Sequence, residues 1–128
     1  MADDAAATVE ALQAALKEFA QARDWEQFHT PKNLSMALAG ECAEVVEHFQ
    51  WLTPEMSASL AADKRDAVAL ELADVFIYTL RLASILDVDL VEATQRKMAI
   101  NEQRYPAERV RGDARRADEW SETDKEAE

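Results

Sequence analysis

The segment DAVALELADVFIYTLRLASIL, residues 66–86, gives the strongest indication of how this chain folds. It contains neither Gly nor Pro, and apolar side chains cover nearly every face of the helix that it would form. A helix that is apolar on all sides is typical of the centre of a helical bundle. We therefore predict that residues 66–86 form the central helix of an all-α protein.

One narrow strip of this predicted helix is polar. At about 100° per residue, Glu71, Asp74, Tyr78 and Arg81 share one direction. Two carboxylates on a mostly apolar helix repel each other, and the chain has no Lys or Arg between Arg65 and Arg81. Placing such a strip inside a protein costs free energy unless it is compensated. A divalent cation bound by these two carboxylates would compensate their charge directly.

A second acidic pair, Glu41-x-x-Glu44, lies in GECAEVVE. Residues three apart on a helix face a similar direction, so each pair presents two carboxylates to one point. Four carboxylates on two facing helices provide the oxygen ligands that Mg²⁺ prefers, with Mn²⁺ as an alternative. Carboxylate di-iron bundles use Glu-x-x-His, whereas His48 follows Glu44 by four residues. A solvated acidic edge is the competing interpretation, and it fits Glu41 and Glu44 better than it fits Glu71 and Asp74.

Three further helices are predicted around the central one, over residues 8–22, 31–51 and 90–104. Thr30-Pro31 and Thr53-Pro54 each have the N-cap and N1 residues that begin a helix, and Asp89 with Glu92 forms a capping box. These signals predict a four-helix bundle in a domain of residues 1–106. Residues 107–128 are charged and have little apolar periodicity, so we expect a tail that is mobile or folds only against another subunit.

The composition excludes several classes of protein. With 128 residues and 48% hydrophobic content, the chain is long enough for one packed domain. A net charge of −12 argues against binding to a nucleic-acid polymer, which depends on Lys and Arg neutralising phosphates. The same charge repels a free nucleotide, so a polyphosphate ligand requires a cation to mediate its binding.

Nothing in the sequence indicates a membrane or secreted protein. No run of about 18 apolar residues is present, and the start of the chain, MADDAAATVE, is acidic rather than basic. The single cysteine, Cys42, cannot form an internal disulfide. We expect a cytoplasmic protein that has no membrane partner.

Aromatic and basic side chains outside the acidic pairs suggest that the ligand is a nucleotide. Trp25 and His29 lie in the connector before the second helix, and Trp51 ends that helix. Such aromatic groups either stack on a base or cover the core, and the sequence leaves both open. A stripe of basic and amide side chains on the last helix suits an oligophosphate, although a solvated edge is the commoner meaning. It consists of Lys97, Asn101 and Arg104.

Four segments together resemble a known family. They are RDWEQFHTPKNL, GECAEVVEHFQW, ELADVFIYTLRLA and KMAINEQRYP, within residues 23–106. The chain resembles the all-α nucleoside triphosphate pyrophosphatases of the MazG-like superfamily, and is most similar to their dCTP pyrophosphatase branch. The resemblance implies helical hairpins that associate into dimers or tetramers. It also implies hydrolysis of a deoxynucleoside triphosphate to the monophosphate and pyrophosphate, for cleansing of the nucleotide pool.

The resemblance also implies roles for individual residues. Mg²⁺ would be bound by Glu41, Glu44, Glu71 and Asp74, and one of the first two, which the sequence does not distinguish, would position the attacking water. The base and sugar would be contacted by Trp25, His29, Trp51 and Tyr78. The phosphates would be held by Lys97 and Asn101, with Arg104 and Tyr105 as weaker candidates. His48 departs from the apolar residue expected there, and either lies near the base pocket or faces water.

Two other functions stay open at this point. One is a related pyrophosphatase with broader specificity or with a preference for 5-modified nucleotides. The other is a non-enzymatic helical oligomerisation module, in which the acidic strip is purely structural. Magnesium-dependent nucleotide binding is expected only of an enzyme.

Overall fold

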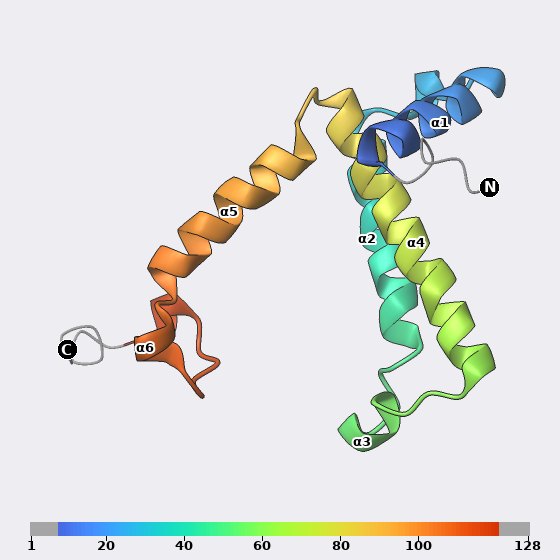
Figure 1. The fold of residues 1–128 in the computed structure, drawn as a ribbon. Coiled ribbons are helices and arrows are strands. Elements are labelled where there is room, and N and C mark those ends of the chain that lie inside the picture. The colour runs from blue at the N-terminus through green and yellow to red at the C-terminus, as the bar shows by residue number, and fades with distance from the viewer. Residues whose placement is uncertain (1–7, 121–128) are drawn as a thin grey trace. The chain divides into compact units, whose positions relative to one another are not determined.

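The computed structural model describes residues 8–120, which fall into two units, residues 8–89 and 90–120. Within that range every regular element is a helix (Figure 1). The prediction of an all-α fold is therefore confirmed.

The first unit is built on a pair of long helices. α4 (Ala62–Ile85) lies alongside α2 (Pro31–Glu47), and α1 (Val9–Ala22) crosses the C-terminal part of α4 (Figure 1). The Gln13 side-chain amide donates a hydrogen bond to the Leu80 carbonyl and ties α1 to α4. Two short helices, η2 (Glu26–Phe28) and α3 (Pro54–Ser57), lie in the connections.

The predicted helix starts at Thr8, Thr30 and Thr53 are confirmed by their caps. The hydroxyls of Thr8, Thr30 and Thr53 accept hydrogen bonds from backbone N–H groups three residues later, at 3.0–3.2 Å. Each cap pairs one of the N–H groups that a helix start leaves without a partner.

Two helix boundaries differ from the prediction. α2 ends at Glu47 rather than at residue 51, because residues 48–51 form a turn in which Leu52 N–H donates to the Phe49 carbonyl. α4 begins at Ala62 rather than at residue 66, since the strong helix formers before Asp66 extend the helix without a side-chain cap.

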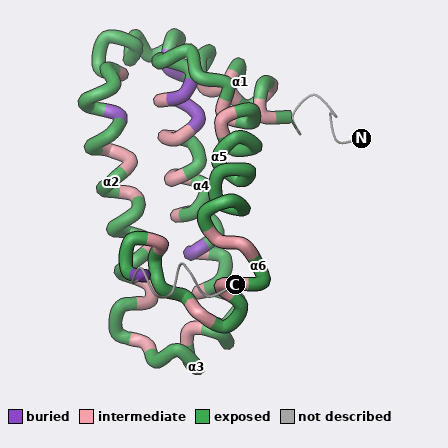
Figure 2. The backbone as a smooth tube through the Cα atoms, turned by 90° about the vertical axis from the view of Figure 1, so that its left-hand side faces the viewer, coloured by how far each residue is buried: buried purple, intermediate pink, exposed green. Residues whose placement is uncertain are grey.

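Buried residues of the first unit appear in purple in Figure 2. Most belong to the ends of α1 and α4 and the start of α2, namely Ala20, Leu34, Leu80, Arg81 and Ala83, whereas Val68 is buried nearer the start of α4. Within residues 8–89, α1 and α2 cover only part of α4, and Leu70, Leu72 and Phe76 are exposed.

The second unit consists of α5 (Leu90–Arg104), α6 (Ala107–Val110) and η3 (Ala117–Glu119). The Tyr105 hydroxyl accepts a hydrogen bond from Ala117 N–H at 3.2 Å, and the rings of Tyr105 and Trp120 meet edge to face at 5.8 Å. Trp120 is buried. The domain boundary after residue 106 and the mobility of the tail stay predictions, and residues 121–128 lie outside the described range.

No helix within residues 8–120 has the length and apolar character needed to cross a membrane.

Candidate active site

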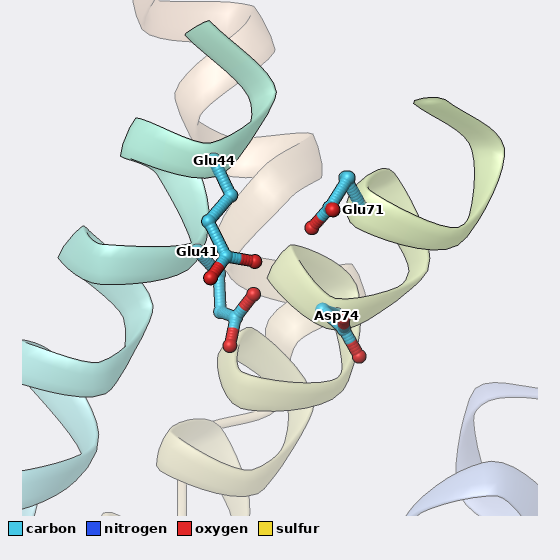
Figure 3. Close-up of side chains that lie close together, drawn as sticks. All are labelled: Glu41, Glu44, Glu71 and Asp74. Atoms are coloured by element: carbon cyan, nitrogen blue, oxygen red, sulfur yellow. The ribbon is translucent and has the colours of Figure 1, made fainter. Parts of the chain in front are cut away.

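Four carboxylates meet between α2 and α4. Glu41 and Glu44 extend from α2 toward Glu71 and Asp74 on α4 (Figure 3). One oxygen from each side chain lies within 4.8 Å of the oxygens of the other three. The i, i+3 spacing within each pair gives two carboxylates a common direction, and the packing of α2 on α4 brings the pairs together. We call this group the carboxylate cluster.

The carboxylate cluster is electrostatically unfavourable without a cation. Glu41 Oε2 and Glu71 Oε2 are buried and have no hydrogen-bond partner. Burial, followed by a hydrogen bond with Glu44, raises the pKa of Glu41. A hydrogen bond with Glu44, followed by burial, raises the pKa of Glu71. Closely spaced, poorly solvated carboxylates resist ionisation, and bound divalent cations compensate them. The residues therefore fit a divalent cation.

His48 lies beside this cluster. Its Nε2 atom is 3.6 Å from Glu71 Oε1, and its side chain is only 19% exposed. The structure thus places His48 next to a carboxylate rather than facing water. Polar groups around metal-binding carboxylates orient them.

Replacing His48 by Ala is expected to weaken binding of a divalent cation about 10-fold, because Glu71 loses the neighbour that orients it. Calorimetric titration with Mg²⁺ or Mn²⁺ measures this affinity. Gln50→Ala, at an exposed position two residues further on, is the control and is expected to bind as the unaltered protein does. Unchanged or tighter binding by His48→Ala would contradict an orienting role.

A cavity of about 380 Å³ adjoins the carboxylate cluster. Asp74 belongs to both, so a ligand in the cavity reaches the cluster. The volume lies in the range of small-molecule sites. The cavity is lined by Leu16, Phe19, Trp25, His29, Asp74, Ile77, Tyr78 and Arg81.

The end of α1 directs Trp25 into this cavity. Asp24 adopts a left-handed conformation with φ of 53°, which Asp tolerates better than most residues. Trp25 N–H then donates to the Ala20 carbonyl at 2.9 Å. The indole meets Phe19 edge to face at 5.7 Å and His29 at 6.5 Å. A Trp held in this way forms one wall of the cavity.

Arg81 lines the same cavity, and sequence reasoning did not select it as a site residue. It is 4% exposed, and its Nε atom donates a hydrogen bond to His29 Nδ1 at 3.0 Å. Its Nη2 atom lies 3.7 Å from Glu26 Oε1. One sequence feature could have identified Arg81: it is the one basic residue on the polar strip of the central helix.

The structure therefore brings Trp25, His29 and Tyr78 together with the carboxylate cluster. Trp51 is 86% exposed and does not line the cavity. The remaining predicted residues belong to the second unit, and their part in a site stays a prediction. Lys97, Asn101 and Arg104 are exposed on α5, and the Arg104 guanidinium lies 5.6 Å from the centre of the Tyr105 ring.

The chain is similar to one family and to several pyrophosphatases. Residues 37–119 match the MazG-like family. The chain is 45% identical over 111 residues to dCTP pyrophosphatase 1 of Homo sapiens, covering 85% of this chain and 65% of that protein. With the Bos taurus protein of the same name it is 45% identical over 109 residues, covering 84% of this chain and 64% of that protein. The chain thus spans less than two thirds of the length of these relatives.

A solved structure is also similar. The crystal structure of a pyrophosphatase from Archaeoglobus fulgidus superposes with a TM-score of 0.61 at 37% sequence identity. The match covers 76% of this chain and 91% of that one.

Proposed function

The chain belongs to the MazG-like family, and we propose that it is a Mg²⁺-dependent nucleoside triphosphate pyrophosphatase. Its substrate would be dCTP or a related 5-modified deoxynucleotide, hydrolysed to the monophosphate and pyrophosphate to cleanse the nucleotide pool. The names of the curated relatives support this substrate. The observation that carries the proposal is a cluster of four carboxylates that shares Asp74 with a cavity of about 380 Å³.

The carboxylate cluster would hold the cation through Glu41, Glu44, Glu71 and Asp74, with Mn²⁺ as an alternative to Mg²⁺. When bound, the ion neutralises triphosphate charge and lowers the pKa of water. Glu41 or Glu44 would position the attacking water toward the α-phosphorus by accepting its hydrogen bond.

The remaining predicted residues would bind the substrate. Trp25, His29 and Tyr78 line the cavity and would contact the base and sugar, together with Trp51. Lys97 Nζ would stabilise the charge that develops on departing pyrophosphate. Asn101, Arg104 and Tyr105 would assist in holding the phosphates.

A homo-oligomer, either a dimer or a tetramer, is part of the same proposal. The large apolar side chains of Leu70, Leu72 and Phe76 are exposed on α4. Exposed apolar surface of this kind marks protein contacts when it is contiguous. Within residues 8–89, α1 and α2 leave these side chains uncovered, which supports an association of chains that would cover them.

Calorimetry with dCTP, in the presence and absence of Mg²⁺, tests the proposal. We expect binding and pyrophosphate release only when the cation is present, because the chain carries a net charge of −12. A panel of canonical and 5-modified nucleotides separates a dCTP-specific enzyme from one of broader specificity. If no nucleotide binds with Mg²⁺, the helical oligomerisation module becomes the better interpretation.

Replacing Lys97 by Met is expected to lower kcat/KM for dCTP about 10- to 100-fold, because a charge-assisted hydrogen bond to the phosphates is lost. Steady-state assays of pyrophosphate release measure the effect. Arg96→Met removes a neighbouring exposed cation from another face of α5 and is the matched control. Equal activity of the two variants would remove Lys97 from the proposed site.

A further inference from the structure

We propose that Arg81 selects the nucleobase, by presenting, together with His29, hydrogen-bond donors to the O2 and N3 acceptors of cytosine. This inference rests on the proposed function, since it concerns how the same cavity distinguishes cytosine from thymine or uracil.

The first observation is an incompletely bonded guanidinium. Arg81 is the one charged residue that is buried within residues 8–120. Its Nη2 atom is buried and has no hydrogen-bond partner. The carboxylate of Glu26 lies 3.7 Å away, beyond hydrogen-bond distance, and its side chain is 46% exposed, so water can solvate it. A buried charged donor without a partner is costly. Since Arg81 lines the adjoining cavity, a small movement of its side chain would let a ligand acceptor there pair this donor and remove that cost.

The second observation fixes the hydrogen-bonding state of His29. A guanidinium only donates, so the 3.0 Å contact from Arg81 Nε requires His29 Nδ1 to be an acceptor. The proton of the neutral imidazole is then on Nε2. Burial, followed by the positive charge of Arg81, lowers the pKa of His29, which favours the neutral ring. The cavity therefore has two neighbouring polar residues that both act as donors.

Base chemistry makes this arrangement selective. Cytosine has two adjacent acceptors, O2 and the unprotonated N3. Thymine and uracil carry a proton on N3, which would face a donor instead of accepting from it. A site whose buried donors stay unpaired rejects the mismatched ligand strongly. Stacking on Trp25 tolerates any base, so the discrimination falls to polar groups of the cavity such as these donors.

The test compares Arg81→Met with the unaltered protein on dCTP and dTTP. We expect kcat/KM for dCTP to fall about 10- to 100-fold, while kcat/KM for dTTP changes much less, so that the preference for cytosine collapses. Arg65→Met removes an exposed cation from the same helix, away from the cavity, and should leave the preference unchanged. A parallel fall for both nucleotides would overturn the proposal, because it would show a structural role alone.

A second measurement uses the unaltered protein and so does not depend on how the variant folds. In 3-deaza-dCTP a C–H group replaces N3, and we expect about 10- to 100-fold weaker binding than dCTP in Mg²⁺. Equal binding of the two would overturn the proposal, whatever Arg81→Met does. If the unaltered protein does not turn over dCTP at all, the proposed function fails and the inference falls with it. Turnover of dCTP with no sensitivity to Arg81 or to N3 refutes the inference alone.

Discussion

Replacing Glu71 by Gln is expected to lower the Mg²⁺-dependent turnover of dCTP by about 10³-fold. Gln preserves the size of the side chain and removes its charge. Oxygens from Glu71 and the three neighbouring carboxylates lie within 4.8 Å of one another, so each would contribute to the proposed cation site. A neutral amide in this position weakens the attraction on which the proposed catalysis depends.

The matched control is Glu47→Gln. Glu47 is the last residue of α2 and is exposed, and it does not belong to the carboxylate cluster. The Glu47→Gln variant should retain full turnover of dCTP. Circular dichroism of both variants shows whether the helices persist. If the Glu71→Gln variant is correctly folded and turns over dCTP as fast as the Glu47→Gln variant, the carboxylate cluster is not the metal site.

The acidic pairs could be anticipated from sequence because helical spacing encodes direction. Glu71 and Asp74 share a face on any regular helix, and their uncompensated charge on an apolar helix indicated a cation. The Thr-Pro starts were equally clear, since a capping hydroxyl and a ring at N1 act within a few residues. The end of α2 was less clear, because apolar spacing continues through Phe49 and Trp51 although the backbone turns after Glu47.

The cavity could not be anticipated from sequence in the same way. Its polar centre joins Arg81 to His29, which are 52 residues apart. That contact requires the left-handed turn at Asp24 and the crossing of α1 over α4, which local patterns do not encode. The polar strip identified Arg81 as unusual, but only tertiary packing shows that it is buried against a histidine. Trp51 is exposed and lies outside the cavity, so its contact with a base stays a prediction.

Mg²⁺ is expected to stabilise the protein by about 2.7 kcal/mol when present at 100 times its dissociation constant, because it binds the folded chain and not the dispersed carboxylates of the unfolded chain. The midpoint of urea unfolding should rise accordingly, without a change in slope. The double variant Glu41→Gln, Glu71→Gln should lose this response. Both of these carboxylates have a raised pKa and a buried oxygen without a hydrogen-bond partner, so a bound cation would compensate them in particular.

Ionic strength needs a control, because any salt screens the repulsion within a chain of net charge −12 and stabilises it to some degree. NaCl at matched ionic strength supplies that control and should give a smaller rise in the midpoint. The same two salts applied to the double variant should give equal, small rises. If Mg²⁺ and matched NaCl stabilise the unaltered protein equally, then screening accounts for the whole effect. The four carboxylates would in that case be an acidic edge that holds no specific ion.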